Sequence, residues 1–350
     1  MPSPLRIVVM GTGPFAVPMF EALCDSPHEI VAVVTRPDHA PPGRRPPPNP
    51  MRAAAVAAGL PILDPERVND PQSVAALAAL RPNLFVVCDY GQILSRDLLA
   101  VPPLGGINLH GSLLPRHRGA APVQWAILAG DADTGVSVIH MTPALDAGNV
   151  IGAVSTPIGP HETAAELERR LAELGRGAVI EAIAKLQEAA AGERPVGVPQ
   201  DAALATRAPR ITKADGIVNW EHDAARIERM RRALEPWPRA TTFFERGDGV
   251  RQRLVLEDVA VADAAGGAGE ESAEGVADAA GAADAAGAAG AAGAAAAPGT
   301  VLVAGGERLV VACGGGTAVE IRRLVPEGRR SMSAAEFLRG SPLRVGSRLG

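Results

Sequence analysis

The residues that could carry chemistry begin with an asparagine and a histidine in the stretch Ile-Asn-Leu-His-Gly-Ser-Leu-Leu-Pro, which starts at Ile107. Residues Ile107–His110 are typical of a β-strand, in which side chains two apart project from the same face. Asn108 and His110 therefore point together from the carboxyl end of a strand, where open α/β sheets bind ligands. An asparagine amide can donate a hydrogen bond to a developing oxyanion, and a histidine can donate a bond or move a proton. The alternative is a histidine that only completes a buried hydrogen-bond network.

An aspartate, Asp146, follows the predicted strand Val136–Met141 in the turn Ala-Leu-Asp-Ala-Gly-Asn. A turn aspartate usually binds only its own turn, but beside the Asn108 strand it could orient the imidazole of His110 and stabilise its charged form. Ser112 is the only hydroxyl nearby, and it lacks the strand–turn–helix setting of a hydrolase serine. Without a nucleophile, the set favours direct group transfer to an amine over a covalent intermediate.

The turn after the first predicted strand, Gly11-Thr12-Gly13, invites a dinucleotide-binding interpretation. However, Ala16 replaces the third glycine of that fingerprint, and Arg36 rather than an acid follows the second strand. A tight strand-to-helix turn, or an anion site at the helix N-terminus, are the simpler alternatives. An NAD-dependent oxidoreductase is therefore disfavoured, and we expect no nicotinamide binding.

Residues 1–192 alternate between predicted strands and helices, an arrangement that brings such side chains to one edge of a sheet. The short apolar runs include Leu5–Met10, Glu29–Thr35 and Leu84–Cys88, and the amphipathic stretch Glu162–Ala191 is typical of a long helix. Strands that alternate with helices imply right-handed βαβ units. We predict an α/β catalytic domain with a Rossmann-like, mostly parallel sheet flanked by helices.

A second domain is predicted over residues 211–350. Residues 193–210 are proline-rich and then polar, so we expect a linker there. A helix at Ala224–Leu234 precedes several short, closely spaced strands, which predict a smaller C-terminal β-barrel of the OB-like kind. Within it, residues 262–298 hold 20 alanines and 8 glycines, a low-complexity composition that cannot bury a core and predicts a flexible insertion.

Composition narrows the class of protein. The chain of 350 residues is 47% hydrophobic, enough for real cores, and no run reaches the roughly 18–20 apolar residues of a membrane helix. Its three distant cysteines argue against a disulfide framework and structural zinc, and favour a reducing, cytoplasmic compartment. The net charge of −5 is uneven: residues 257–298 hold eight acids and no base, whereas residues 299–350 hold eight bases and four acids. The basic part of the C-terminal third could attract phosphates.

Together these motifs resemble the methionyl-tRNA formyltransferases, a family of folate-dependent formyltransferases, over nearly the whole chain. The pattern Asn-x-His, Ser-Leu-Leu-Pro and Asp-x-Gly is common to the folate-dependent enzymes of this fold, whereas Arg-Gly-Ala-Ala-Pro from Arg118 and Pro-Trp-Pro from Pro236 are more specific. Further matching positions are Gly11–Ala16, Thr35–Asp38, Tyr90–Leu94, Gly130–Asp131, Thr134–Val136, Lys213, Asn219–Trp220 and Met332–Ala334.

The resemblance implies formyl transfer from 10-formyltetrahydrofolate to the amino group of methionine on initiator methionyl-tRNA, with no metal or redox cofactor. It implies a catalytic set of Asn108, His110 and Asp146. It implies a folate site lined by Ser112, Leu113, Leu114 and Pro115. The implied contacts to tRNA are Arg44 and Arg45 in the proline-rich loop His39–Asn49, with Lys213 and Arg232 in the second domain. The expected partners are thus tRNA and folate, with no membrane, and the chain is expected to be a monomer.

Two positions near the site depart from the family pattern. Asp89 stands where alanine is usual, so a carboxylate is expected near the folate pocket. His117 stands where tryptophan or tyrosine is common, which removes aromatic area beside Arg116 and Arg118. Two alternatives stay open: a sugar-nucleotide or glycinamide-ribotide formyltransferase, which would lack the tRNA-type second domain, and a folate- or tRNA-binding module without catalysis.

Overall fold

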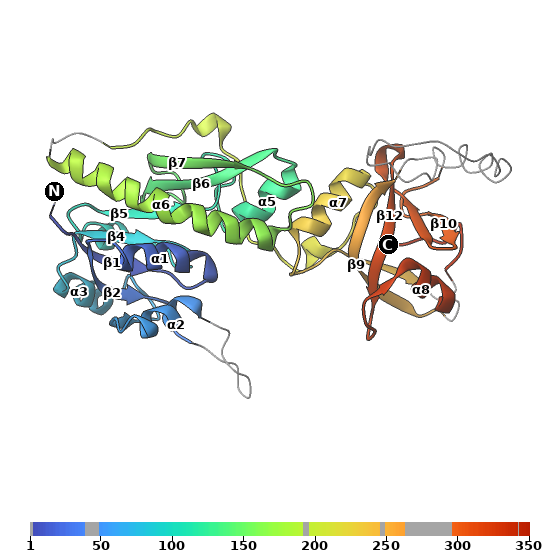
Figure 1. Cartoon of the computed structure of the whole chain (residues 1–350), viewed down its shortest axis with the longest axis horizontal. Coiled ribbons are helices and arrows are strands. Elements are labelled where there is room, and N and C mark those ends of the chain that lie inside the picture. The colour runs from blue at the N-terminus through green and yellow to red at the C-terminus, as the bar shows by residue number, and fades with distance from the viewer. Residues whose placement is uncertain (1–2, 39–48, 192–195, 246–248, 263–295, 342) are drawn as a thin grey trace, which may run out of the picture. The chain divides into compact units, whose positions relative to one another are not determined.

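The computed structural model describes residues 3–38, 49–191, 196–245, 249–262, 296–341 and 343–350, which belong to two compact units (Figure 1). The first unit contains Met1–Ala126 and Asp131–Arg210, and the second contains Ile127–Gly130 and Ile211–Gly350. Within the described residues, no helix is long and apolar enough to cross a membrane.

A seven-stranded sheet forms the centre of the first unit, in the order β3-β2-β1-β4-β5-β6-β7. The first five strands in this order pair in parallel, whereas β6 pairs antiparallel with both β5 and β7. The strands are β1 (Arg6–Met10), β2 (Glu29–Val34), β3 (Ile62–Leu63), β4 (Leu84–Val87), β5 (Gly106–His110), β6 (Asp133–His140) and β7 (Val150–Pro157). The mostly parallel sheet flanked by helices is therefore confirmed.

Strict alternation of strands and helices fails at one edge of this sheet. A helix connects β5 to β6, yet the two strands pair antiparallel, and the sequence analysis did not predict β7. Successive side chains of β7 alternate between covered and exposed, and the strand carries Ser155 and Thr156. Its apolar signal is weak because only one of its faces is covered.

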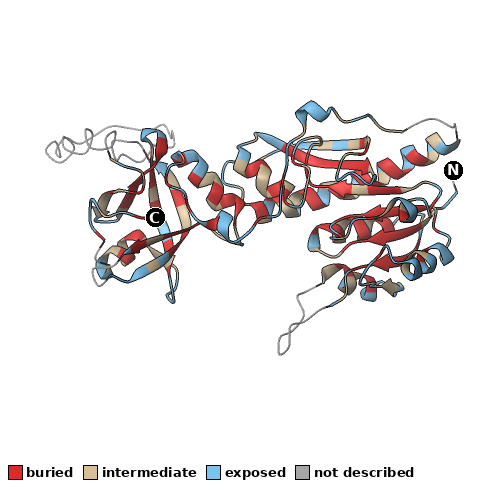
Figure 2. Ribbon diagram, turned by 180° about the vertical axis from the view of Figure 1, so that it is seen from behind, coloured by how far each residue is buried: buried red, intermediate tan, exposed pale blue. Residues whose placement is uncertain are grey.

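Helices cover both faces of the sheet, and the central strands are buried (Figure 2). On one face, side chains of α3 and α4 join a cluster with alternate residues of β1 and β4, including Val8 and Val87. Leu109 of β5 points to the opposite face, where it lies against Gly175 of α6, and α6 packs along α1. The helices are α1 (Val17–Cys24), α2 (Pro50–Ala57), α3 (Pro71–Ala79), α4 (Arg96–Leu99), α5 (Pro122–Ala129) and α6 (Ala164–Ala191).

The second unit is built on a curved antiparallel sheet in the order β10-β11-β12-β9-β8, with β13 paired to β12. The C-terminal residues join its two edges: the Gly350 amide donates to the carbonyl of Phe243 (2.9 Å), and the Leu349 amide donates to that of Gly299 (2.8 Å). This closure agrees with the predicted barrel. Its elements are α7 (Ala224–Ala233), β8 (Thr241–Glu245), β9 (Arg251–Ala262), β10 (Val301–Gly305), β11 (Arg308–Ala312), β12 (Ala318–Pro326), β13 (Met332–Ser333) and α8 (Ala334–Gly340).

The segment predicted as a linker is held against the first unit from residue 196 onward. Val198 and Val150 exchange both of their backbone hydrogen bonds at 2.9 Å, and Arg207 forms a parallel bridge with Arg118. Residues 193–195 lie outside the described residues, as do residues 263–295 of the predicted insertion. The chain therefore leaves the first unit only after it has passed the loops that follow β5.

The packing of α6 on β5 predicts a contrast between two glycines of one helix. A Cβ at Gly175 would stand 2.5 Å from Cδ2 of Leu109, whereas a Cβ at Gly177 would meet nothing within 4 Å. Gly177→Ala should stabilise the protein by about 0.5–1 kcal/mol, because glycine is a poor helix residue. Gly175→Ala should be less stable than Gly177→Ala by about 1–3 kcal/mol, the usual cost of overpacking. Urea unfolding measures both, and equal stabilities would contradict this packing.

Candidate active site

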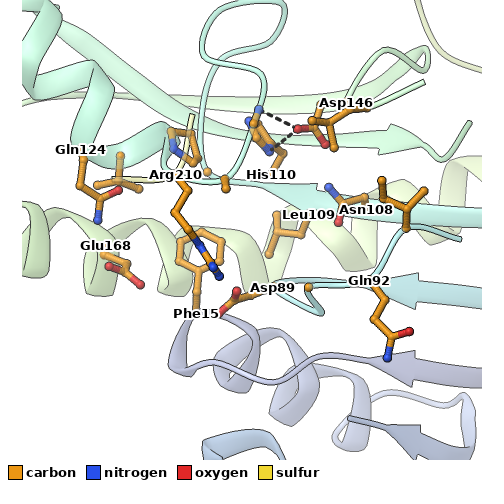
Figure 3. A pocket seen from close by; sticks show the side chains of 18 residues that line it. Phe15, Asp89, Gln92, Asn108, Leu109, His110, Gln124, Asp146, Glu168 and Arg210 are labelled. Atoms are coloured by element: carbon orange, nitrogen blue, oxygen red, sulfur yellow. Dashed lines mark hydrogen bonds and ion pairs between the residues drawn. The ribbon is translucent and has the colours of Figure 1, made fainter. Parts of the chain in front are cut away.

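The candidate site is a cavity of about 400 Å³ at the carboxyl ends of β4 and β5 (Figure 3). Asn108 and His110 line it from β5, and Asp146 lines it from the loop between β6 and β7. A smaller cavity of about 140 Å³ adjoins it and shares Asn108 and Asp146 among its walls. The structure thus brings the three residues of the predicted catalytic set to one place, as the i, i+2 spacing and the strand order required.

Asn108 offers a free amide to this cavity. Its side chain is half-buried, and no hydrogen bond joins its carboxamide to another described residue. In Figure 3 the amide faces the open space beside His110. A carboxamide that is fixed on a strand but has no partner can donate to an oxygen atom of a bound molecule without giving up a protein contact.

His110 is held by both of its ring nitrogens and is only 6% exposed. Nε2 lies 2.9 Å from the backbone carbonyl oxygen of His117. A carbonyl only accepts, so Nε2 carries a proton and Nδ1 is the nitrogen free to gain or lose one. Nδ1 lies 3.7 Å from Oδ2 of Asp146. Burial lowers the pKa of His110 below its ordinary value, and the Asp146 carboxylate acts in the opposite direction.

Asp146 has an unusual backbone that explains the Asp-x-Gly motif. Its φ is +48°, in the left-handed region that aspartate tolerates better than most residues. This conformation lets Oδ2 accept from the backbone amide of Gly119 at 2.9 Å while it faces His110. Two residues on, a Cβ at Gly148 would stand 1.8 Å from the carbonyl oxygen of His140, so only glycine fits.

His117 anchors the loop whose carbonyl holds His110. It is buried, its Nε2 lies 2.7 Å from Oδ2 of Asp131, and its amide donates to Oγ1 of Thr206 at 2.8 Å. Asp131 also binds the guanidinium of Arg116. The expected loss of aromatic area at position 117 is therefore accompanied by an imidazole–carboxylate contact.

Asp89 places a carboxylate on the cavity wall, as the sequence predicted. It follows β4 with φ at +48°, and its Oδ2 occupies the space where a Cβ of Gly13 would be. Burial raises the pKa of Asp89 to about 6. Burial, and after it the Asp89 carboxylate, raises the pKa of Glu168 across the cavity. A pyrophosphate at Gly13 would meet the Asp89 carboxylate, which argues against the dinucleotide alternative.

The loop Ser112–Pro115 does not reach either cavity. Ser112, Leu113, Leu114 and Pro115 are absent from the described residues that line them. The hydroxyl of Ser137 on β6 instead donates to the carbonyl of Ser112 (2.8 Å) and accepts from the amide of Leu114 (3.1 Å), so the loop folds onto β6. The hydroxyl of Ser112 also donates to the carbonyl of Arg116 at 2.7 Å, so this loop supports the start of the 116–119 loop. The expected contacts of Ser112–Pro115 to folate stay a prediction.

The structure describes two of the four residues that were predicted to contact nucleic acid, Lys213 and Arg232. Arg44 and Arg45 lie outside the described residues. Lys213 is exposed in the second unit. Arg232 is not available to a phosphate, because its side chain is only 8% exposed and its Nε donates to Oε1 of Glu228 at 2.7 Å. The sequence did not indicate this burial, because Arg232 stands among other basic residues of α7 but lies on the buried side of the helix.

Sequence reasoning missed four residues at the site. Ile93 and Leu145 line both cavities with apolar side chains that are 69% and 63% exposed. Arg210 projects into the larger cavity (Figure 3) without an ion pair to any described residue. Gln200 binds two of the loops described above. Exposed apolar residues in the loops after strands could have indicated the first two, but no local pattern singles out Arg210 or Gln200.

The raised pKa of Asp89 predicts a pH-dependent stability difference for Asp89→Asn, a change that the left-handed backbone tolerates. The folded-state pKa of about 6 exceeds the value of 3.8 taken for the free side chain, so folding disfavours the ionised form. The wild-type protein should therefore lose stability relative to the variant as the pH rises from about 4 to about 6, and the difference should be constant above about 7. Thermal melts across this range measure it. A constant difference at every pH would contradict the shift.

Comparison with known proteins places these observations in a family. The model of the formyl transferase domain matches residues 5–183, and that of the formyl transferase C-terminal domain matches residues 210–342. A methionyl-tRNA formyltransferase of Rhodopirellula baltica is 43% identical over 100% of this chain and 98% of its own, and one of Roseiflexus castenholzii is 38% identical over 99% of both. The crystal structure of HypX from Aquifex aeolicus in complex with tetrahydrofolic acid shares the fold, with a TM-score of 0.55 and 17% identity over 99% of this chain and 51% of that one. The chain belongs to the formyl transferase family and, within it, to the methionyl-tRNA formyltransferases.

Proposed function

We propose that the protein transfers a formyl group from 10-formyltetrahydrofolate to the amino group of methionine on initiator methionyl-tRNA. The observation that carries this proposal is the meeting of Asn108, His110 and Asp146 in one cavity. It is supported by relatives that are named methionyl-tRNA formyltransferase and align with this chain from end to end.

The two adjoining cavities fit a folate donor. The smaller cavity lies between Tyr90, Leu94 and Ile139, which are buried apolar or aromatic residues suited to a flat ring system. Ile93 and Leu145, which are largely exposed, would cover the part of the donor that projects from the cavity toward solvent. When bound, 10-formyltetrahydrofolate supplies an activated formyl carbon, and Asn108 stands where the two cavities meet.

The chain's own groups can stabilise the charge that develops during transfer. Attack of an amine on a formyl carbon turns the carbonyl oxygen into an oxyanion. The unpartnered amide of Asn108 can donate to that oxygen, and Nδ1 of His110 can donate when it is protonated. Removing one such donor typically lowers the rate by about 10²–10³-fold.

Proton transfer falls to Nδ1 of His110, because Nε2 is held by the His117 carbonyl. Burial keeps the free imidazole neutral near pH 7, so it can take a proton from the attacking nitrogen. The Asp146 carboxylate, 3.7 Å away, then stabilises the imidazolium. The same nitrogen can return the proton to the leaving nitrogen of the folate.

The tRNA contacts that we propose are Arg44, Arg45 and Lys213, which would bind phosphates. Arg210 adds a cation at the cavity itself, where it could bind a phosphate of the aminoacylated 3′ end. Arg232 is left out of this set because it is buried and bound to Glu228.

Single-turnover formylation tests the proposal. Purified protein, 10-formyltetrahydrofolate and methionine-charged initiator tRNA should give formylmethionyl-tRNA rapidly, while elongator methionyl-tRNA should react far more slowly. Formylation of neither tRNA by a protein that still binds folate would contradict the proposal and indicate another amine acceptor.

Substitution of the two β5 residues should separate chemistry from binding. His110→Ala should lower the transfer rate by about 10²–10⁴-fold, and Asn108→Ala by about 10²–10³-fold, with the dissociation constant of folate little changed. Gln187→Ala is the control. Gln187 lies at a remote end of α6, and among the described residues its side chain binds only the carbonyl of Ser3. Near-normal turnover by the His110 variant would rule out the proton-transfer role.

A further inference from the structure

Gln200 joins the two loops on which the site depends. Its Oε1 accepts from Nε and from a terminal nitrogen of Arg118, at 3.0 and 2.7 Å. Its Nε2 donates to the carbonyls of Asp146 and Gly148, both at 2.8 Å. A glutamine side chain has two acceptor positions and two donors, so all four are used.

The orientation of this amide is fixed by chemistry. A guanidinium can only donate and a backbone carbonyl can only accept, so the oxygen of Gln200 must face Arg118 and its nitrogen must face the Asp146 loop. The bonds to the charged guanidinium are of the stronger, charge-assisted kind. The half-buried side chain is therefore a rigid bridge between two segments that lie far apart in the sequence.

Each end of this bridge leads directly to His110. At one end, Arg118 lies between His117, whose carbonyl holds Nε2, and Gly119, whose amide holds Asp146. At the other end, the Asp146 carbonyl belongs to the residue whose carboxylate faces Nδ1. Any separation of the two loops would move Asp146 away from both Gly119 and His110.

Backbone hydrogen bonds on both sides of Gln200 keep the bridge in place. Val198 pairs with Val150 on one side, just after the Asp146 loop. On the other side, the amide of Arg118 donates to the carbonyl of Thr206 (2.9 Å), and the carbonyl of Arg118 accepts from the amide of Ala208 (2.7 Å). Gln200 thus lies within a segment, residues 198–208, that is bonded to both loops.

We propose that Gln200 is a positioning residue for formyl transfer, which acts by holding the Asp146 loop and the 117–119 loop in register around His110. The inference rests on the proposed function for its activity readout. It requires no contact between Gln200 and either substrate, and Gln200 does not line the cavities.

Two near-isosteric variants separate positioning from stability. Gln200→Met removes all four hydrogen bonds. In Gln200→Glu, one carboxylate oxygen still accepts from Arg118, now as an ion pair. The other oxygen faces the carbonyls of Asp146 and Gly148 and cannot donate to them. Both should lower the single-turnover rate at saturating substrates by about 10–10²-fold, the effect of a displacement of about 1 Å, while the dissociation constant of folate changes by less than about threefold. Gln200→Glu should lose less thermal stability than Gln200→Met, because its carboxylate still binds the Arg118 guanidinium. Gln187→Met is the matched control and should behave as wild type.

Hydrogen exchange gives a readout that does not need the reaction. Backbone amides of residues 144–149 should exchange faster in both Gln200 variants, and those of residues 117–121 should do so in Gln200→Met. Wild-type transfer rates in both variants, or unchanged exchange in both loops, would overturn the proposal. If the wild-type protein formylates no tRNA, the proposed function fails, but the exchange comparison still decides whether Gln200 holds the loops.

Discussion

The hydrogen bond from Nε2 of His110 to the carbonyl of His117 is the constraint on which the rest of the site depends. It fixes the position of one proton and leaves Nδ1 as the nitrogen that exchanges protons. That nitrogen faces Asp146, and the strand that carries His110 also carries the free amide of Asn108. One backbone carbonyl therefore determines how the imidazole, the carboxylate and the carboxamide can work together.

The surrounding loops pay a conformational cost to supply this carbonyl and this carboxylate. Both His117 and Asp146 have positive φ, at 59° and 48°, which is unfavourable for residues other than glycine. Each is held by contacts that offset this strain. His117 is bound to Asp131 and Thr206, and Asp146 accepts from the amide of Gly119. A strained backbone that is fixed from several directions is suited to preorganised catalysis, because little reorganisation is needed during the reaction.

Local patterns predicted the parts of the molecule that depend on neighbours in sequence. The i, i+2 spacing placed Asn108 and His110 on one face of a strand, and the turn motif placed Asp146 after the next strand. The strand β7 was not predicted because one of its faces is solvated, which weakens its apolar pattern. The burial of Arg232 was not predicted because its neighbours on α7 are also charged. No local pattern could place the Ser112–Pro115 loop on β6, because Ser137 holds it there through a contact across 25 positions in sequence. Gln200 left no signal, since both loops that it binds are more than fifty residues away.

The most direct test of this account is the tautomer of His110 in solution. In a long-range proton–nitrogen correlation spectrum of protein labelled with ¹⁵N-histidine, His110 can be assigned by its absence in His110→Gln. Above the pKa of the imidazole, we expect Nε2 to carry the proton and Nδ1 to show the shift of an unprotonated nitrogen. A proton on Nδ1 instead would mean that the His117 carbonyl does not hold this ring, and the proposed route for the proton would be wrong.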